Sequence, residues 1–175
     1  MCAAWAGYVG TIQALGVAAS FGDLSSQQIA GLELTSAPYL AEVVGVIGES
    51  WPAELESERT TVIEQRIGPY TRRAGRAVDT LAGAGATTAE LSELRSAWLS
   101  ALATRDPQSP VLAVPTVSAQ VQAKLDAAAT VYDGTLTPFA QDPSLVVDSV
   151  DAPLTDAYLL AHCPDLAASG VGDAL

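Results

Sequence analysis

The two cysteines of this chain lie near its opposite ends, where they could form a disulfide. Cys2 falls on the apolar stripe of a helix predicted at the start of the chain, and Cys163 falls in the last turn of the final predicted helix. If these helices run antiparallel, the two sulfur atoms can meet. Such a bridge would stabilise the fold by about 4 to 5 kcal/mol and favours an oxidising compartment. Two reduced core thiols, or a lipid attached to Cys2, are the alternatives.

Four neighbouring arginines form the candidate ligand-binding site: Arg66, Arg72, Arg73 and Arg76. Their spacing places Arg72 and Arg76 on one helical face, and Arg66 shares another face with Arg73. Guanidinium groups bind carboxylates and phosphates through paired hydrogen bonds, so this cluster could hold an anion. The simpler interpretation is that the arginines neutralise acidic helices packed beside them.

His162 is the only histidine, which limits histidine-dependent chemistry. With Cys163 and Cys2 it could supply three metal ligands. However, adjacent helical residues point about 100° apart, and a structural zinc ion needs four well-placed ligands. We therefore expect no metal, and interpret His162 as a surface histidine beside a disulfide. No Gly-x-Ser-x-Gly segment is present, so we do not expect a serine hydrolase.

The acidic residues complete no recognised catalytic or calcium-binding pattern. Four glutamates flank the arginines: Glu54, Glu56, Glu58 and Glu64. They occupy a stretch that we expect to face water, so solvated charge is favoured over acid–base catalysis. Asp148, Asp151 and Asp156 lack the spacing of a calcium loop, and Asp151 is instead predicted to cap a helix. No catalytic residue and no cofactor are predicted.

Apolar residues recur at three- and four-residue spacing through most of the chain, which predicts helices. The predicted helices cover residues 2–19, 36–51, 53–82, 88–102, 117–132 and 153–163. We expect Ser36, Thr87 and Thr116 to cap three of them, and Gly68-Pro69 to kink or divide the third. Strand signals are poor. The predicted fold is an all-α antiparallel bundle of five to six helices, with a disulfide joining the first helix to the last.

With 175 residues, of which 49% are hydrophobic, the chain can bury the core of a single domain. We expect that domain over residues 1–163, followed by a C-terminal tail over 164–175. The net charge is −12, and all eight basic residues lie between Arg59 and Lys124. Nucleic acids and anionic membranes bind mainly through Lys and Arg, so neither is an expected partner.

No apolar run reaches the roughly 18 to 20 residues of a membrane-spanning helix, so no transmembrane segment is predicted. The first four residues do not have the character of a signal peptide. If the protein is exported, we expect its targeting segment to be missing from this sequence.

Three short segments carry a resemblance to known proteins: Cys2-Ala3-Ala4-Trp5, Ala37-Pro38-Tyr39 and Cys163-Pro164. With these segments the chain resembles the small exported or lipid-anchored helical proteins of actinobacteria, a mostly uncharacterised group. In this chain a proline follows Cys163, where glycine would be more usual. The resemblance implies an extracytoplasmic helical bundle, secreted or anchored at the cell surface, and no particular activity.

Three functional hypotheses remain open on the sequence. The first is a non-enzymatic exported domain that binds a protein or a component of the cell envelope. The second is a small-molecule binding protein, with a pocket between helices that Trp and Tyr residues line and the arginine cluster selecting an anion. The third is an enzyme without a recognisable signature. The sequence predicts no oligomeric state.

Overall fold

The computed structural model describes residues 1–21, 24–104, 112, 114–135, 150–164 and 166. Six α-helices occupy most of these residues: α1 (Cys2–Phe21), α2 (Ser26–Glu49), α3 (Gly68–Gly83), α4 (Thr88–Ala103), α5 (Ala119–Thr135) and α6 (Pro153–His162). A 3₁₀ helix, η1 (Ala53–Glu58), and a π-helical turn, η2 (Thr61–Arg66), connect α2 to α3. The described residues contain no strand, which confirms the all-α prediction.

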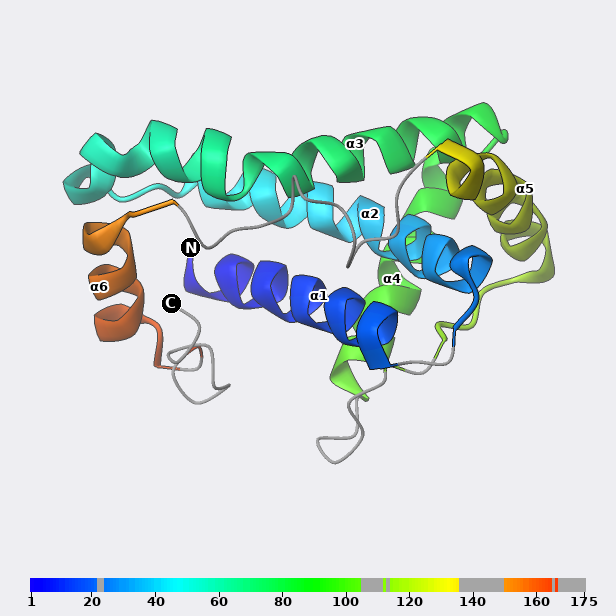
Figure 1. Ribbon diagram of the computed structural model, residues 1–175, viewed down its shortest axis with the longest axis horizontal. Helices are drawn as coiled ribbons and strands as arrows, with labels where there is room; N and C mark the ends of the chain where they lie inside the picture. The colour runs from blue at the N-terminus through cyan, green and yellow to red at the C-terminus, as the bar shows by residue number, and fades with distance from the viewer. Residues whose placement is uncertain (22–23, 105–111, 113, 136–149, 165, 167–175) are drawn as a thin grey trace.

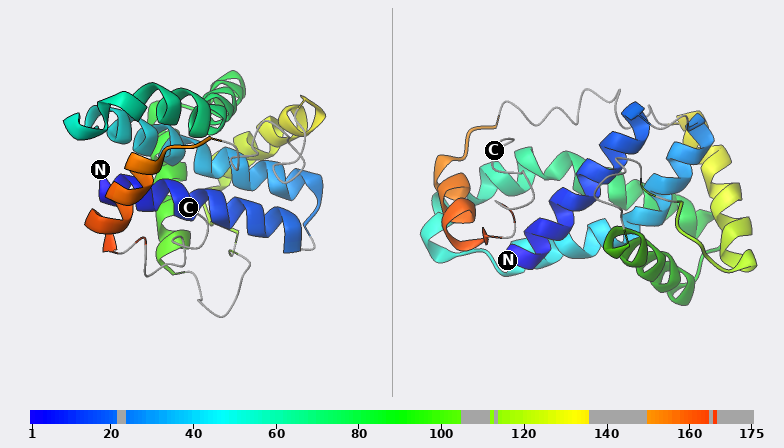
Figure 2. Two further views of the ribbon diagram at one scale, coloured as in Figure 1. Left: turned by 60° about the vertical axis from the view of Figure 1, so that its left-hand side comes forward. Right: turned by 90° about the horizontal axis from the view of Figure 1, so that it is seen from below.

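Helix α2 is the centre of the bundle, because α1, α3, α4 and α5 all pack against it. Figure 1 shows α1, α2 and α3 running along the long axis with alternating direction, while α4 crosses behind them. Helix α6 lies across one end of the bundle, beside η1 and the start of α1, as both figures show (Figures 1 and 2). The ends of the described chain therefore meet at one end of the molecule.

Helix α2 begins earlier than predicted, and the expectation that Ser36 caps it is wrong. Ser25 is the cap: its hydroxyl accepts a hydrogen bond from Gln28 N–H, and the Gln28 side chain accepts one from Ser25 N–H. The helix continues through Pro38, which normally ends or kinks a helix because it lacks an N–H group. Burial of apolar residues on both sides of this proline offsets that loss. Ser36 instead donates a hydrogen bond to the carbonyl oxygen of Glu33, 2.9 Å away.

The predicted interruption at Gly68-Pro69 is confirmed, and it takes the form of a π turn. The N–H of Ile67 donates to the carbonyl oxygen of Val62 over 3.0 Å, five residues back along the chain. Pro69 then occupies the first turn of α3, where a missing N–H is harmless. Before this turn in the chain, η1 contacts α6.

Two other helix starts test the predicted caps. Thr87 forms the predicted capping box with Glu90 at the start of α4. The prediction for Thr116 is wrong, because α5 starts at Ala119 and the N–H of Val121 donates to the hydroxyl of Ser118. Ser118 also donates from its own N–H and hydroxyl to Glu93 on α4, so the α4–α5 contact fixes where α5 begins.

Aromatic side chains fill much of the core. The large residues buried there include Trp5, Tyr8, Tyr70, Trp98 and Tyr132. Trp98 Nε1 donates to the hydroxyl of Thr11 over 3.0 Å, a buried contact between α4 and α1. Leu166, which was assigned to the C-terminal tail, is also buried in this core.

Two segments, Cys2–Ala19 and Ser26–Glu49, are long and apolar enough to cross a membrane by length and composition alone. In the fold, 39% of the first segment and 61% of the second is buried within the protein. Core helices of soluble proteins meet the same criterion, and α2 is the helix on which four others pack.

Candidate functional site

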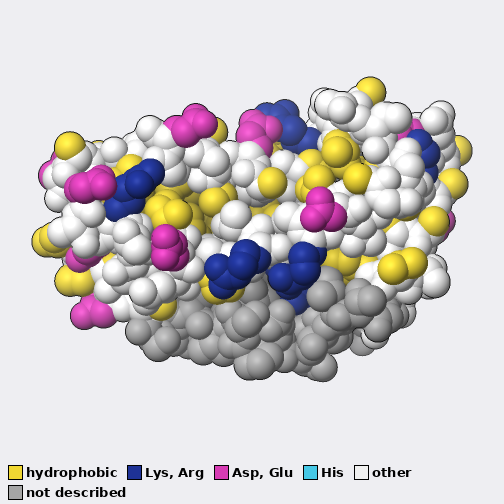
Figure 3. Space-filling view, turned by 90° about the horizontal axis from the view of Figure 1, so that it is seen from above, with side chains coloured by type: hydrophobic (Ala, Val, Ile, Leu, Met, Phe, Trp, Pro, Cys, Tyr) yellow, Lys and Arg dark blue, Asp and Glu magenta, His cyan; other side chains and the backbone are white. Residues whose placement is uncertain are grey.

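The four predicted ligand-binding arginines occupy different environments in the fold. Arg73 is buried, Arg66 is half-buried, and Arg72 and Arg76 are exposed on α3. Among the described residues, Arg72 and Arg76 form no ion pair within 4.0 Å. Figure 3, a view from the α3 side, shows two basic side chains near each other in the middle of this face and other basic side chains apart from them. The described residues therefore do not bring the four arginines together around one anion site.

Arg73 is held by a buried carboxylate. Its Nε and Nη2 donate to the two oxygens of Glu33, each over 2.9 Å, and Tyr132 Oη donates to Glu33 Oε2 over 2.7 Å. Glu33 and Arg73 are only 5% and 4% exposed. Burial first, and then the neighbouring Glu33 carboxylate, raise the pKa of Tyr132, so its hydroxyl stays protonated and donates. This contact joins α2, α3 and α5.

A small cavity of about 10 Å³ lies beside this ion pair. Its lining combines apolar side chains with Glu33, Ser36, Tyr70, Arg73 and Tyr132. A space of this size holds about one water molecule. Among the described residues, this cavity most resembles the predicted ligand pocket between helices. However, the guanidinium group of Arg73 is already hydrogen-bonded to Glu33 and is not free to bind an anion.

The N-terminal end of α6 is held by η1 and η2. The expected cap Asp151 is not the N-cap residue: Ala152 holds that position and makes no side-chain cap. Glu58 of η1 supplies the cap instead, accepting hydrogen bonds of 3.0 Å from Leu154 N–H and 2.8 Å from both Thr155 N–H and the Thr155 hydroxyl. Burial raises the pKa of Glu58, but these three bonds and nearby Arg66 outweigh it, so the pKa is lowered.

Arg66 adds a second hold on the same end of α6. Its Nη1 and Nη2 contact the two oxygens of Asp156 at 2.5 and 3.1 Å, and Nη2 also donates to the carbonyl oxygen of Val150 over 2.9 Å. The pair is largely buried, since the side chains are 11% and 19% exposed. Thus one of the predicted anion-binding arginines has a carboxylate of its own chain as its partner.

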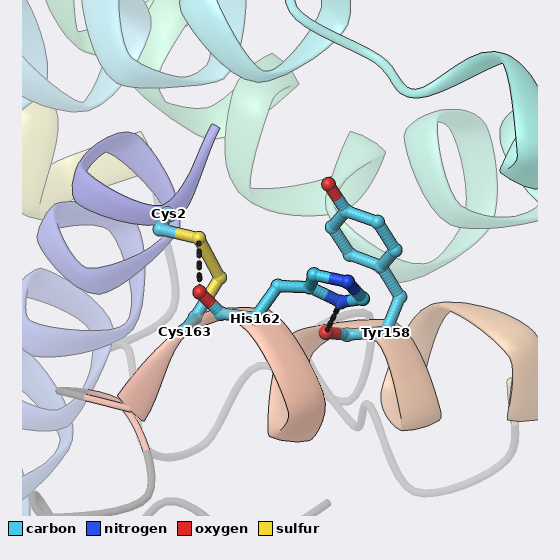
Figure 4. Close-up of a disulfide and its surroundings, with 4 residues drawn as sticks. All are labelled: Cys2, Tyr158, His162 and Cys163. Carbon is cyan, nitrogen blue, oxygen red and sulfur yellow. Dashed lines mark hydrogen bonds between the residues drawn. A yellow bond between two sulfur atoms is a disulfide. The ribbon is translucent and has the colours of Figure 1, made fainter.

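The C-terminal end of α6 is joined covalently to α1, which confirms the predicted disulfide. Cys2 and Cys163 are bonded, and their Cα atoms lie 5.3 Å apart. Figure 4 shows Cys2 Sγ close to the carbonyl oxygen of His162, at 3.4 Å. The His162 ring stacks on Tyr158 with centroids 4.3 Å apart, and its Nδ1 lies 3.0 Å from the Tyr158 carbonyl oxygen.

No metal site is formed by the described residues. Among them, no three His, Cys, Asp or Glu side chains lie where they could hold one ion. Both cysteines that were considered as ligands beside His162 are in the disulfide. Asp148 lies outside the described residues, while Asp156 is paired with Arg66.

The outward side of α6 is apolar and exposed. Leu154 and Leu160 are 52% and 47% exposed, and Ala157, Ala161 and Pro164 are exposed beside them. At 100° per residue the four of these side chains that belong to α6 span about 120° of the helix surface, and Pro164 follows just beyond the helix end. The opposite side buries Thr155, Leu159 and Cys163. We call the five exposed residues the α6 outer face.

Acidic residues surround this end of the molecule. Segments 49–66 and 150–163 contain seven carboxylates and two arginines, a formal charge of −5. Only Asp156 of these carboxylates forms an ion pair within 4.0 Å among the described residues, and Glu58 caps α6. The other five are Glu49, Glu54, Glu56, Glu64 and Asp151. Figure 3 shows mainly acidic side chains, with apolar ones between them, at the end that η1 and η2 form. We call these five residues the acidic patch.

Comparison with known proteins found no matching family model, no matching curated protein and no matching solved structure.

Three residues that organise these contacts were not predicted from the sequence: Glu33, Glu58 as a cap, and Tyr132 as a donor. Glu33 had a usable signal, because it stands among apolar residues of α2, between Leu32 and Leu34, far along the helix from Glu42 and Glu49. A charge at such a position needs a buried partner. Nothing in the sequence near Glu58 indicates that it caps a helix 96 residues later.

Proposed function

We propose that this chain is a non-enzymatic helical domain that binds a protein or a component of the cell envelope, and that it works outside the cytoplasm. The α6 outer face is the proposed binding surface. It combines exposed leucines with a helix whose two ends are both fixed to the rest of the fold.

The observation that carries this proposal is the contrast between the two sides of α6. Glu58, Arg66 and the disulfide hold its inner side and both ends, yet Leu154 and Leu160 remain about half exposed. A short helix held this firmly presents its apolar side chains with little loss of conformational freedom on binding. Exposed apolar groups of this kind are typical of interaction surfaces.

The disulfide supports the proposed compartment. Disulfides persist in secreted and cell-surface proteins and are rare in the reducing cytosol. Here the bond joins residues 161 positions apart and so encloses nearly the whole chain. A protein that depends on such a bond is suited to an oxidising environment.

The alternative of a small-molecule binding protein depends on the cavity beside Arg73. A carboxylate or phosphate ligand would have to displace Glu33 from Arg73 and enlarge a space of about 10 Å³. Breaking a buried ion pair is unfavourable. The α6 outer face needs no such rearrangement, so we favour it.

The direction of the pKa shifts also favours binding over catalysis. The pKa values of Glu42, Glu58 and Glu90 are all lowered, and hydrogen bonds from cationic or backbone groups stabilise each carboxylate in its ionised form. A general acid requires the opposite shift, usually through burial in apolar surroundings.

Photocrosslinking in the producing cells tests the proposed surface. We would place p-benzoylphenylalanine at position 160 or 157 of the full chain, and at position 114, which is exposed and lies on another part of the fold, as the matched control. We expect a discrete adduct with one macromolecule from positions 160 and 157 and none from 114. Adducts from all three positions alike, or from none, would overturn the proposal.

A further inference from the structure

We propose that the α6 outer face and the acidic patch together bind a basic amphipathic helix of a partner protein. This inference rests on the proposed function and names the chemistry of the partner. Leucines of α6 would pack against the apolar side of the incoming helix, and Lys or Arg residues flanking that side would lie over the acidic patch.

Charge complementarity is the first argument for a basic partner. Glu54 and Glu56 are exposed on η1, the element against which α6 packs, and Asp151 is exposed immediately before α6. Arg59 is the one exposed cation within segments 49–66 and 150–163, because Arg66 is half-buried against Asp156. The field at this end is therefore negative, and it accelerates the approach of cations and disfavours anionic surfaces.

The same charge argues against two other occupants. A second copy of this chain, paired face to face about a two-fold axis, would bring two ends of formal charge −5 together. An anionic membrane surface would be repelled in the same way. A basic helix meets both the apolar and the acidic parts of the surface without repulsion.

The geometry sets the size of the partner segment. From Leu154 to Leu160 the α6 outer face is about 9 Å long, at 1.5 Å per residue. Two to three turns of a partner helix would cover it, with apolar side chains at spacings of three and four residues. Glu54 and Glu56 of the acidic patch lie on η1, which contacts α6, and Asp151 lies just before α6. The partner's basic residues are therefore expected beside its apolar stripe.

Two synthetic helical peptides test this inference on the oxidised full chain. Each has about four turns, with leucines on one side and either lysines (the Leu/Lys peptide) or glutamates (the Leu/Glu peptide) on the other. We expect the Leu/Lys peptide to bind, measured by fluorescence anisotropy, and the Leu/Glu peptide not to bind. The double variant Leu154→Ser/Leu160→Ser should weaken Leu/Lys binding at least about tenfold, an effect size expected of interface anchors.

A charge-matched pair of variants separates local recognition from general attraction. Glu54→Lys/Glu56→Lys changes the acidic patch, and Asp79→Lys/Asp126→Lys makes the same change in net charge at exposed sites on α3 and α5. We expect only the first variant to weaken binding about tenfold or more. Equal weakening by both, or equal binding of the two peptides, would overturn the inference. Binding of zwitterionic vesicles that depends on Leu154 and Leu160 would also overturn it.

The outcomes distinguish this inference from the proposed function. If the Leu/Lys peptide does not bind but position 160 still crosslinks to one macromolecule in cells, the partner is not a basic helix and the binding function stands. If both experiments fail, both proposals are wrong. Circular dichroism and intact mass establish that each variant is folded and its disulfide is formed.

Discussion

Glu33 shows how a single buried side chain can connect three helices. Its two oxygens accept hydrogen bonds from Arg73 on α3 and Tyr132 on α5, while its backbone belongs to α2. Replacing one member of such a pair leaves a buried polar group with fewer partners. The pair therefore restricts the relative position of these helices more than apolar contacts alone would.

Glu90 is the residue for which we predict a pH effect. Hydrogen bonds from Lys124 and then from Thr87 lower its pKa from 4.5 to about 2. Because the folded-state pKa lies below the unfolded one, the stabilisation is present above about pH 4.5 and is lost as the pH falls toward 2. Acid unfolding of Glu90→Gln, followed by circular dichroism, should be shallower over this range than that of the wild type. The variant Glu49→Gln, at an exposed glutamate, is the control, and equal profiles for wild type and Glu90→Gln would contradict the prediction.

For single residues, the sequence indicated which side chains could form ion pairs but not which partners they would pair with. The cluster of arginines was recognised, but Arg73 and Arg66 find their carboxylates 40 and 90 residues away along the chain. Periodicity describes one helix at a time and contains no information on which helices pack together. The capping box at Thr87 was predictable because both members lie within one turn.

Among the elements, α1 and α2 approach closely because Gly7 has no side chain. A Cβ atom built at Gly7 would lie 2.0 Å from the hydroxyl oxygen of Tyr39 on α2. Gly10, one turn later, has nothing within 4 Å of the same position. The close approach of α1 to Tyr39 of α2 therefore requires glycine at position 7 but not at position 10.

Alanine substitutions of the two glycines should have opposite effects. Gly7→Ala forces Tyr39 or α1 to move, and overpacking of this kind destabilises by about 1 to 3 kcal/mol. Gly10→Ala should stabilise α1 by about 0.5 to 1 kcal/mol, because alanine favours the helix. Urea unfolding of both variants measures the difference. Equal midpoints would show that the Tyr39 hydroxyl does not limit the approach of the helices.

Helix ends show why some elements were predicted accurately and others were not. Ser25 and Gln28 carry a complete local signal, but Ser36, two residues before Pro38, was predicted as the cap of α2. In the fold, burial of apolar residues on both sides of Pro38 outweighs its local preference. The start of α6 depends on Glu58, a residue of another element, and no local pattern indicates such a cap.

For the whole molecule, the disulfide is the covalent bond that joins α6 to α1. Reduction should lower the free energy of unfolding by about 4 to 5 kcal/mol in the loop-entropy model. Hydrogen exchange should then increase first in α6, a ten-residue helix that is marginal in isolation, and least in the central α2. Mass spectrometry with and without reductant, combined with exchange measurements, checks both effects.

The matched variant for this experiment is Cys2→Ser/Cys163→Ser, which removes the bond without reductant. It should behave like the reduced wild type. If exchange in α6 is unchanged in both, then Glu58 and Arg66 alone are sufficient to hold the helix. At this scale the sequence predicted the closure correctly, because the two cysteines fell at the ends of the first and last helices.

The bond between Cys2 and Cys163 also determines how the protein responds to mechanical force. Tension applied to the chain before residue 2 and after residue 163 passes through one covalent bond, so the helices between these residues carry none of it. Pulled from both sides, the chain therefore keeps its bundle intact, and with it the orientation of α6.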